Sequence, residues 1–124
     1  MTETGIICTS GRDNGNHMLI TTNCGAEIID ISTIIRIEAL SNYSKLFFVN
    51  GKTLVVAKVL RWFEEGLSAE IFIRTHRTHL VNKQFIHAYR HGNGAQVKLV
   101  NGESINVSKR KKKFLLQSLC ALTV

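Results

Sequence analysis

Two short basic segments in the second half of the chain hold the side chains that are best suited to binding a polyanion. The first is Arg74–Asn82, which reads Arg-Thr-His-Arg-Thr-His-Leu-Val-Asn, and the second is Ser108–Lys113, which reads Ser-Lys-Arg-Lys-Lys-Lys. Their cations, imidazoles and hydroxyls are the donors that reach phosphate oxygens and base edges. Arginine can also form two hydrogen bonds with guanine in the major groove. The two segments therefore indicate nucleic-acid binding.

The charge of the chain is concentrated in the same half. The 124 residues carry a net charge of +7, but residues 1–70 contribute −2, from 6 Lys or Arg and 8 Asp or Glu. Residues 71–124 contribute +9, from 10 Lys or Arg and a single carboxylate, Glu103. A one-sided excess of this kind is typical of proteins that bind nucleic acid or an anionic membrane.

The position of the second basic segment strengthens this interpretation. Ser108 is a favourable N-cap for a helix whose apolar stripe is Leu115, Leu119 and Leu122. Five cations then occupy the first turns, where the helix dipole is positive and each costs roughly a few tenths of a kcal/mol. The simpler alternative is that these five cations are only a solvated charge run. An anion that binds at this helix end would offset the unfavourable placement of the cations, which favours a binding role.

The residues give little support to an enzyme or a metal site. Carboxylates are scattered, no glycine-rich phosphate loop follows a strand, and the three cysteines lie far apart. His76 and His79 have a spacing that zinc ligands can have, but Arg77 between them repels a cation, and no Asp, Glu or Cys joins them. We therefore expect no enzymatic activity, no cofactor, no bound metal and no small-molecule substrate.

Short apolar runs that alternate with turns predict a mainly β domain of small antiparallel sheets. Asn50-Gly51 and Asn101-Gly102 each mark a two-stranded hairpin. Helical spacing of apolar residues predicts one short internal helix over Val59–Leu67 and a C-terminal helix after Ser108. The expected strands are Met18–Thr22, Glu27–Ile31, Ile34–Ala39, Lys45–Val49, Thr53–Ala57, Ile71–Arg74, Ile86–Arg90, Gln96–Val100 and Glu103–Val107, and Arg74–Asn82 is expected to be a loop.

Length and composition predict one folded domain behind a flexible arm. Residues 1–17 are polar and rich in Gly and Asn, so we expect them to form the arm, and residues 18–124 to form the domain. Apolar residues make up 44%, which suffices for a core, yet no apolar run is long enough to span a bilayer. The start lacks the pattern of a secretory signal, and an odd number of scattered cysteines fits a reducing compartment, so we expect a cytoplasmic protein.

The order of these segments resembles the LytTR DNA-binding domain of bacterial transcriptional regulators (the LytR/AlgR family). The features that carry the resemblance are Ile35–Ala39, Asn42-Tyr43, Arg74–Asn82, and the Asn101-Gly102 turn followed by Val107–Arg110. The most specific of them is the block Arg-x-His-Arg-[Ser/Thr]-x-x-Val-Asn at Arg74–Asn82. The likeness extends from about Met18 to the C-terminus.

The resemblance implies a particular way of binding DNA. Loops, rather than a recognition helix, would enter successive major grooves of a promoter, and two copies would bind a pair of direct repeats and bend the DNA. The residues implied as base readers are Ser44, Arg77 and Arg110. Those implied as neighbouring backbone contacts are Asn42, Tyr43, Lys45, Lys109 and Lys111, while His76 and Asn82 are implied to hold the shape of the loop. The side chains of the two basic segments add Arg74, Thr78, His79, Ser108, Lys112 and Lys113 as supporting contacts.

The relatives typically carry a phosphoacceptor receiver domain before the DNA-binding domain. Only about 17 residues precede the match, which leaves no room for a receiver in this chain. We therefore expect a stand-alone regulator, with a domain cut from a larger protein as the alternative.

Two other functions fit parts of the sequence. A protein-interaction module that pairs with a full-length relative, and modulates it without binding DNA, would use Trp62 and Phe63 on the short helix, although core packing is the simpler explanation of both. Single-stranded RNA recognition usually displays aromatic stacking platforms, and only Phe85, Tyr89 and Phe114 lie near the basic segments. We therefore expect a regulator that binds specific double-stranded DNA sequences and no membrane.

Overall fold

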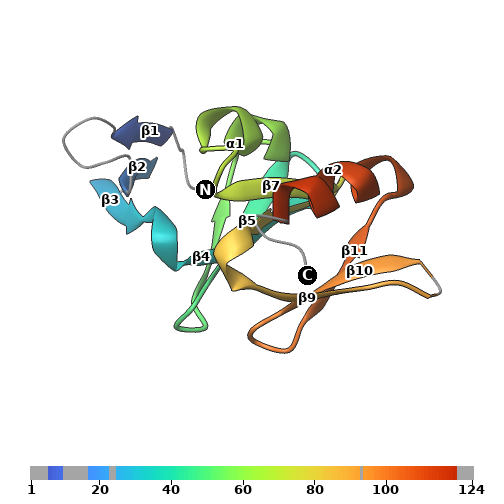
Figure 1. Cartoon of the computed structure of the whole chain (residues 1–124). Helices are drawn as coiled ribbons and strands as arrows, with labels where there is room; N and C mark the ends of the chain where they lie inside the picture. The colour runs from blue at the N-terminus through green and yellow to red at the C-terminus, as the bar shows by residue number, and fades with distance from the viewer. Residues whose placement is uncertain (1–5, 10–16, 23–24, 93, 120–124) are drawn as a thin grey trace.

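The computed structural model describes residues 6–9, 17–22, 25–92 and 94–119, which form three small antiparallel sheets and two helices (Figure 1). The mainly β fold predicted from the sequence is confirmed. The central sheet has five strands in the order β6-β5-β4-β8-β7. Their bounds are β4 (Ile34–Leu40), β5 (Tyr43–Phe48), β6 (Thr53–Val56), β7 (Phe72–His76) and β8 (His79–Asn82).

A three-stranded sheet lies on each side of the central sheet, and two helices complete the domain (Figure 1). The N-terminal sheet contains β1 (Ile6–Thr9), β2 (His17–Thr22) and β3 (Gly25–Asp30), and the C-terminal sheet contains β9 (Ile86–Arg90), β10 (Ala95–Leu99) and β11 (Ser104–Val107). Helix α1 (Leu60–Gly66) follows β6, and helix α2 (Lys109–Leu119) follows β11. Both Asn-Gly hairpins and both helices agree with the sequence analysis.

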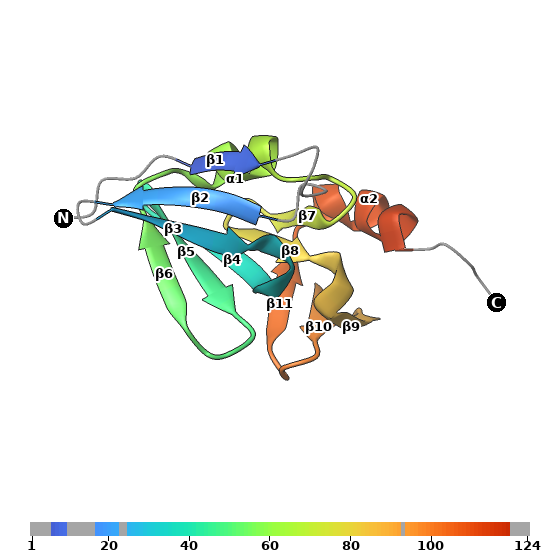
Figure 2. The ribbon, with the colours of Figure 1, turned by 90° about the vertical axis from the view of Figure 1, so that its left-hand side faces the viewer.

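The N-terminal sheet begins within the segment that we expect to be a flexible arm. Ile6–Thr9 pairs with β2 as an antiparallel strand, with Ile6 opposite Ile20. His17, expected at the end of the arm, begins β2. Residues 1–5 and 10–16 lie outside the described residues. Figure 2 shows this sheet on the side that faces the viewer, stacked over the central sheet.

Two apolar clusters hold these layers together. The first lies between the N-terminal sheet, α1 and the central sheet, and it includes the fully buried side chains of Met18, Ile20 and Phe63. The second lies between the central sheet, the C-terminal sheet and α2, where Leu115 is fully buried. Leu119 packs against the second cluster, as the helical stripe predicts, and Leu122 lies outside the described residues. Both faces of the central sheet are therefore covered, and its ends remain available for binding.

A buried arginine ties the central sheet to the β10–β11 turn. Arg36 on β4 is only 7% exposed, and its Nε and Nη2 atoms donate to the two carboxylate oxygens of Glu103 at 2.9 and 3.1 Å. Its Nη1 atom donates to Glu38 at 2.9 Å, and the guanidinium lies 3.7 Å from the centre of the Phe47 ring. The hydrogen bonds from Arg36 lower the pKa of the Glu103 carboxyl.

We predict that Glu103→Gln lowers the free energy of unfolding by about 1–3 kcal/mol at neutral pH, because Arg36 then loses a charged carboxylate that accepts two hydrogen bonds. A carboxyl whose pKa is lowered in the folded state stabilises the fold above its unfolded value, which is near 4.5, and this stabilisation disappears as the pH falls through the folded value. Urea unfolding of both proteins should therefore show a stability difference that shrinks below about pH 4.5.

Glu65→Gln is the matched control for this prediction. The ion pair between Glu65 and Arg61 is exposed, with side-chain exposures of 64% and 79%. Exposed pairs contribute at most about 1 kcal/mol, so this variant should unfold close to wild type. Equal losses in the two variants would contradict the structural role of the Arg36–Glu103 pair.

Candidate nucleic-acid interface

Three segments that the sequence predicts as contacts meet at one end of the central sheet. β4 pairs with β8, and the Ala39 amide donates to the Thr78 carbonyl at 2.9 Å, so the β4–β5 turn lies beside the β7–β8 turn. The Ser108 amide donates to the Thr75 carbonyl at 2.8 Å, which places the start of α2 next to the same end of β7. We call the surface formed by the two turns and the start of α2 the basic end of the domain.

The expected loop over Arg74–Asn82 is a tight hairpin instead. β7 ends at His76 and β8 begins at His79, so only Arg77 and Thr78 form the turn. The strands pair in register from Phe72 opposite Asn82 to His76 opposite His79, with one irregularity between Arg74 and His76. The exposed side chain of Arg77 therefore projects from a hydrogen-bonded hairpin rather than from a loose loop.

The side chain of Arg74 stabilises the β7–β8 turn. Its Nε atom donates to the His76 carbonyl at 2.9 Å and its Nη2 atom donates to the Arg77 carbonyl at 2.6 Å. The remaining nitrogen, Nη1, forms an ion pair with Glu64 on α1. All three guanidinium nitrogens are engaged, so Arg74 supports the turn that carries Arg77.

The other polar residues of the hairpin also hold its shape. Asn82 is fully buried, donates to the Ile34 carbonyl at 3.0 Å and accepts from the Gln84 amide at 2.9 Å. The Thr78 hydroxyl lies 2.9 Å from Nδ1 of His76 and 2.9 Å from Nδ1 of His79. Burial is the main cause that lowers the pKa of His79. These contacts agree with the shape-holding role that the resemblance implies for His76 and Asn82.

A hollow of about 350 Å³ brings the two arginines predicted as base readers together. It lies between the β7–β8 turn, α1 and the start of α2, and is lined by Glu64, Arg74, His76, Arg77, Ser108, Arg110 and Lys111. Glu64 is the one carboxylate of this lining, and it is paired with Arg74. An electron-rich ligand that enters the hollow therefore meets Arg77 and Arg110 without a competing free carboxylate from the lining.

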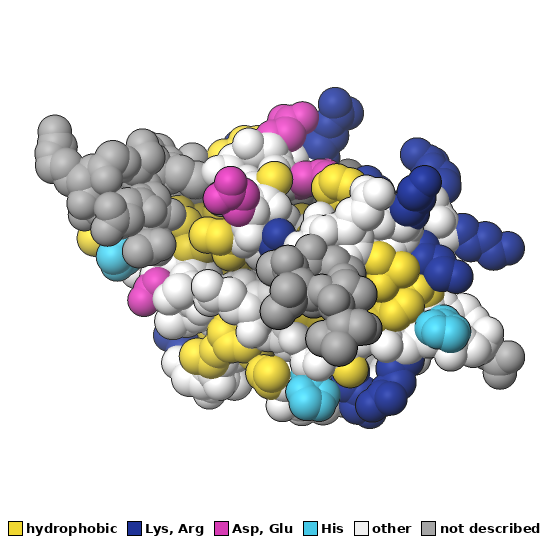
Figure 3. Space-filling model, viewed as in Figure 1, with side chains coloured by type: hydrophobic (Ala, Val, Ile, Leu, Met, Phe, Trp, Pro, Cys, Tyr) yellow, Lys and Arg dark blue, Asp and Glu magenta, His cyan; other side chains and the backbone are white. Residues whose placement is uncertain are grey.

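The start of α2 extends the positive surface beyond the hollow. Lys109, Arg110, Lys112 and Lys113 are exposed, and no acidic residue lies in the first turn of the helix. Figure 3 shows the dark-blue Lys and Arg side chains gathered over α2. Lys109 and Lys112 also line a second hollow, together with His91 of the β9–β10 connection.

The β4–β5 turn is the part of the interface where the structure departs from the expected roles. Ser44 is fully buried and its hydroxyl donates to the Lys58 carbonyl at 2.7 Å. This placement argues against a base contact by Ser44, because neighbouring atoms cover its short side chain. Asn42 and Tyr43 are exposed at the turn, and the ammonium of Lys45 lies 5.2 Å from the centre of the Phe47 ring.

Lys58 is a cation at the basic end that the sequence analysis did not single out. β5 and β6 pair with Ser44 opposite Val56, so the chain after β6 returns to the end of the sheet where the β4–β5 turn lies. The Lys58 ammonium lies 5.4 Å from the centre of the Trp62 ring. The Asn50-Gly51 hairpin was the available signal, because its register returns the chain after β6 to the end of the sheet where the β4–β5 turn lies.

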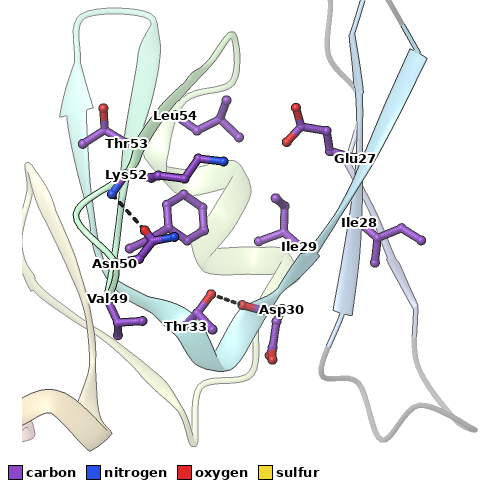
Figure 4. A pocket seen from close by; sticks show the side chains of 11 residues that line it. Glu27, Ile28, Ile29, Asp30, Thr33, Val49, Asn50, Lys52, Thr53 and Leu54 are labelled. Carbon is purple, nitrogen blue, oxygen red and sulfur yellow. Dashed lines mark hydrogen bonds between the residues drawn. The ribbon is translucent and has the colours of Figure 1, made fainter.

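A groove elsewhere on the surface differs in chemistry from the basic end. It lies between β3 and the β5–β6 hairpin, whose turn is at the opposite end of the central sheet. Figure 4 shows Glu27 and Lys52 on opposite walls, with the apolar side chains of Ile29 and Leu54 between them. Mixed charge and apolar lining make this groove a poor site for a polyanion.

The described part of the chain contains no group of three or more His, Cys, Asp or Glu side chains placed to hold a metal ion. None of the helices within residues 6–9, 17–22, 25–92 and 94–119 is long and apolar enough to cross a membrane.

The fold and the basic end together define a DNA-binding domain, and comparison with known families supports this class. Residues 25–119 match the LytTr DNA-binding domain family. The match covers most of the chain, from β3 to the end of α2, and the chain belongs to this family. No curated protein matches the sequence.

A solved structure shows the same fold. It is the LytTr DNA-binding domain of a protein from Bacillus cereus described as a methyl-accepting/DNA response regulator. The two chains superpose with a TM-score of 0.71 and are 23% identical, over 85% of this chain and 97% of the other.

We predict that Arg74 and Arg77, although close in sequence and equal in charge, differ in their effect on stability. Arg74→Ala removes three charge-assisted hydrogen bonds and should lower the free energy of unfolding by about 2 kcal/mol or more. Arg77→Ala removes an exposed side chain and should change it by no more than about 0.5 kcal/mol. Urea denaturation measures both values, and a large loss for Arg77→Ala would show that the turn depends on that side chain.

Proposed function

We propose that this protein is a cytoplasmic transcriptional regulator that binds specific sequences of double-stranded DNA through its basic end. One observation carries the proposal: Arg77 and Arg110, which lie far apart in sequence, line one hollow at the end of the central sheet. Two arginines that line one hollow can each pair with a guanine, at about 1–3 kcal/mol of discrimination per good pair. The family to which the chain belongs supplies the class of partner, which is DNA.

The remaining cations have a different role in this proposal. Lys109, Lys112 and Lys113 project from the start of α2 and contact phosphates, and the free N–H groups of the helix start add to the attraction for anions. Lys58, Asn42 of the β4–β5 turn and Tyr43 at the start of β5 extend the same surface along the end of the sheet. Phosphate contacts set the position of the protein on the duplex but carry no sequence information. Ser44 has no place among the base readers because it is buried.

The proposal includes two copies on one promoter site. The resemblance to LytTR regulators implies a pair of direct repeats and a bend in the DNA, with loops in successive major grooves. Copies that approach one face of the duplex are separated by about 10 base pairs or a multiple of that spacing.

The alternative, a protein-interaction module, has less support from the structure. Phe63, one of its two expected contact residues, is 1% exposed and belongs to the first apolar cluster. Trp62 is half-buried and packs edge-to-face on Phe63, with ring centres 5.3 Å apart. Core packing therefore accounts for both aromatic side chains. Co-purification with a relative, without any shift of DNA, would favour the alternative.

We predict that selection of bound duplexes from a random pool yields a direct-repeat consensus. Each half-site should contain at least one guanine, because the hollow presents arginine side chains. Half-sites should be about 10 base pairs apart, or a multiple of it, centre to centre. Enrichment of duplexes without any shared sequence would contradict specific recognition.

We predict that Arg77→Ala and Lys112→Ala weaken binding in different ways. Arg77→Ala should cost about 1–3 kcal/mol on the selected duplex and little on random DNA, because it removes a base contact. Lys112→Ala should weaken binding to both duplexes alike and reduce the slope of log K against log salt by about 0.9, because it removes one phosphate contact. Fluorescence anisotropy over a series of salt concentrations measures both effects.

Lys52→Ala is the matched control for both variants. It removes one exposed cation from the β5–β6 turn, at the opposite end of the central sheet. If net charge alone governs binding, Lys52→Ala and Lys112→Ala weaken it equally, and the basic end is then not the interface.

A further inference from the structure

The Thr78 hydroxyl lies between two imidazole rings at the tip of the β7–β8 hairpin. Its oxygen is 2.9 Å from Nδ1 of His76 and 2.9 Å from Nδ1 of His79, and the two ring centres are 6.2 Å apart. The Thr78 backbone amide also points at Nδ1 of His76, with a distance of 3.3 Å between the nitrogens. The hydrogen bonds among the Thr78 hydroxyl, the Thr78 amide and the two imidazole rings therefore depend on which ring nitrogens carry protons.

The count of protons determines the tautomer of each ring. A backbone amide can only donate, so Nδ1 of His76 carries no proton and accepts. A hydroxyl has a single proton, so the arrangement that satisfies every contact has Thr78 donating to His76 and accepting from an Nδ1–H group of His79. His76 is then protonated at Nε2, and His79 at Nδ1.

The surroundings of His79 agree with this assignment. Its Nε2 atom lies 4.0 Å from a carboxylate oxygen of Glu38, which is too long for a hydrogen bond, so this contact does not require a proton on Nε2. Burial is the main cause that lowers the pKa of His79, and it favours the neutral ring.

The second nitrogen of His76 is directed away from these contacts. His76 lines the hollow that also contains Arg77 and Arg110, and its Nε2 atom has no hydrogen-bond partner among the described residues. We propose that His76 is both a positioning residue and a DNA contact: its unprotonated Nδ1 atom holds the turn that presents Arg77, and its Nε2–H group donates to an acceptor atom of DNA. This inference rests on the proposed function for its second half only.

The first test needs no DNA. Long-range ¹H–¹⁵N NMR of the full chain near neutral pH distinguishes protonated from unprotonated ring nitrogens. We expect His76 to be protonated at Nε2 and His79 at Nδ1. A proton on Nδ1 of His76 near neutral pH would overturn the proposal, whether or not the chain binds DNA.

The second test uses the duplex obtained by selection and a random duplex of equal length. His76→Asn keeps an acceptor near the position of Nδ1 but has no Nε2–H group. It should bind the selected duplex about three- to tenfold more weakly than wild type, as expected for one lost hydrogen bond. Wild-type affinity of His76→Asn for the selected duplex would refute the DNA contact.

Variants of Thr78 separate the turn from the contact. Thr78→Ser keeps the hydroxyl and should retain the wild-type ratio of specific to random affinity. Thr78→Val removes the hydroxyl and should reduce this ratio about tenfold, because Arg77 is no longer held in place. Equal ratios for the serine and valine variants would show that the hydroxyl does not position the turn. If neither duplex binds wild type, the proposed function fails, while the NMR result still decides the tautomers.

Discussion

The hydrogen bond from the Ser108 amide to the Thr75 carbonyl is the constraint on which the binding surface depends. Thr75 is fully buried in β7, between the exposed turn and the apolar clusters, so its carbonyl is a fixed anchor. The bond places the first turn of α2 beside the β7–β8 turn, and the burial of Leu115 holds the rest of the helix against the second apolar cluster. Two segments of unrelated sequence thereby become one surface.

The Ser108–Thr75 hydrogen bond also brings together positive charges that do not stabilise the fold. The first turn of α2 contains no acidic residue, and Glu64, the carboxylate of the neighbouring hollow, is neutralised by Arg74. Cations at a helix start are unfavourable in the free protein, and the proposed contacts with DNA phosphates or base acceptors would relieve that cost. The structure therefore links a small loss of stability in the free domain to attraction for a polyanion.

Sequence patterns were sufficient to predict the elements with strong local signals and failed where a residue depends on distant partners. Both Asn-Gly hairpins, α1 and α2 were predictable from turn chemistry and periodicity. β8 was not, because its hairpin turns at Arg77-Thr78, without Gly, Asn or Pro. Ser44 was assigned a base contact from the resemblance, which matches positions but does not reveal burial. The ion pair between Arg36 and Glu103 joins residues that are 67 positions apart in sequence, so local patterns could not predict it. The only signal was that Glu103 is the single carboxylate of residues 71–124.

We propose that DNA contacts the basic end of the central sheet and no other surface of the described residues. The most direct measurement is the change of backbone amide NMR signals when the selected duplex is added to the full chain. We expect the largest changes at residues 42–43, 77–78 and 108–113, with little change at the β5–β6 turn (residues 50–52). Changes concentrated along β3 and the β5–β6 hairpin, with none at residues 77–78, would contradict it.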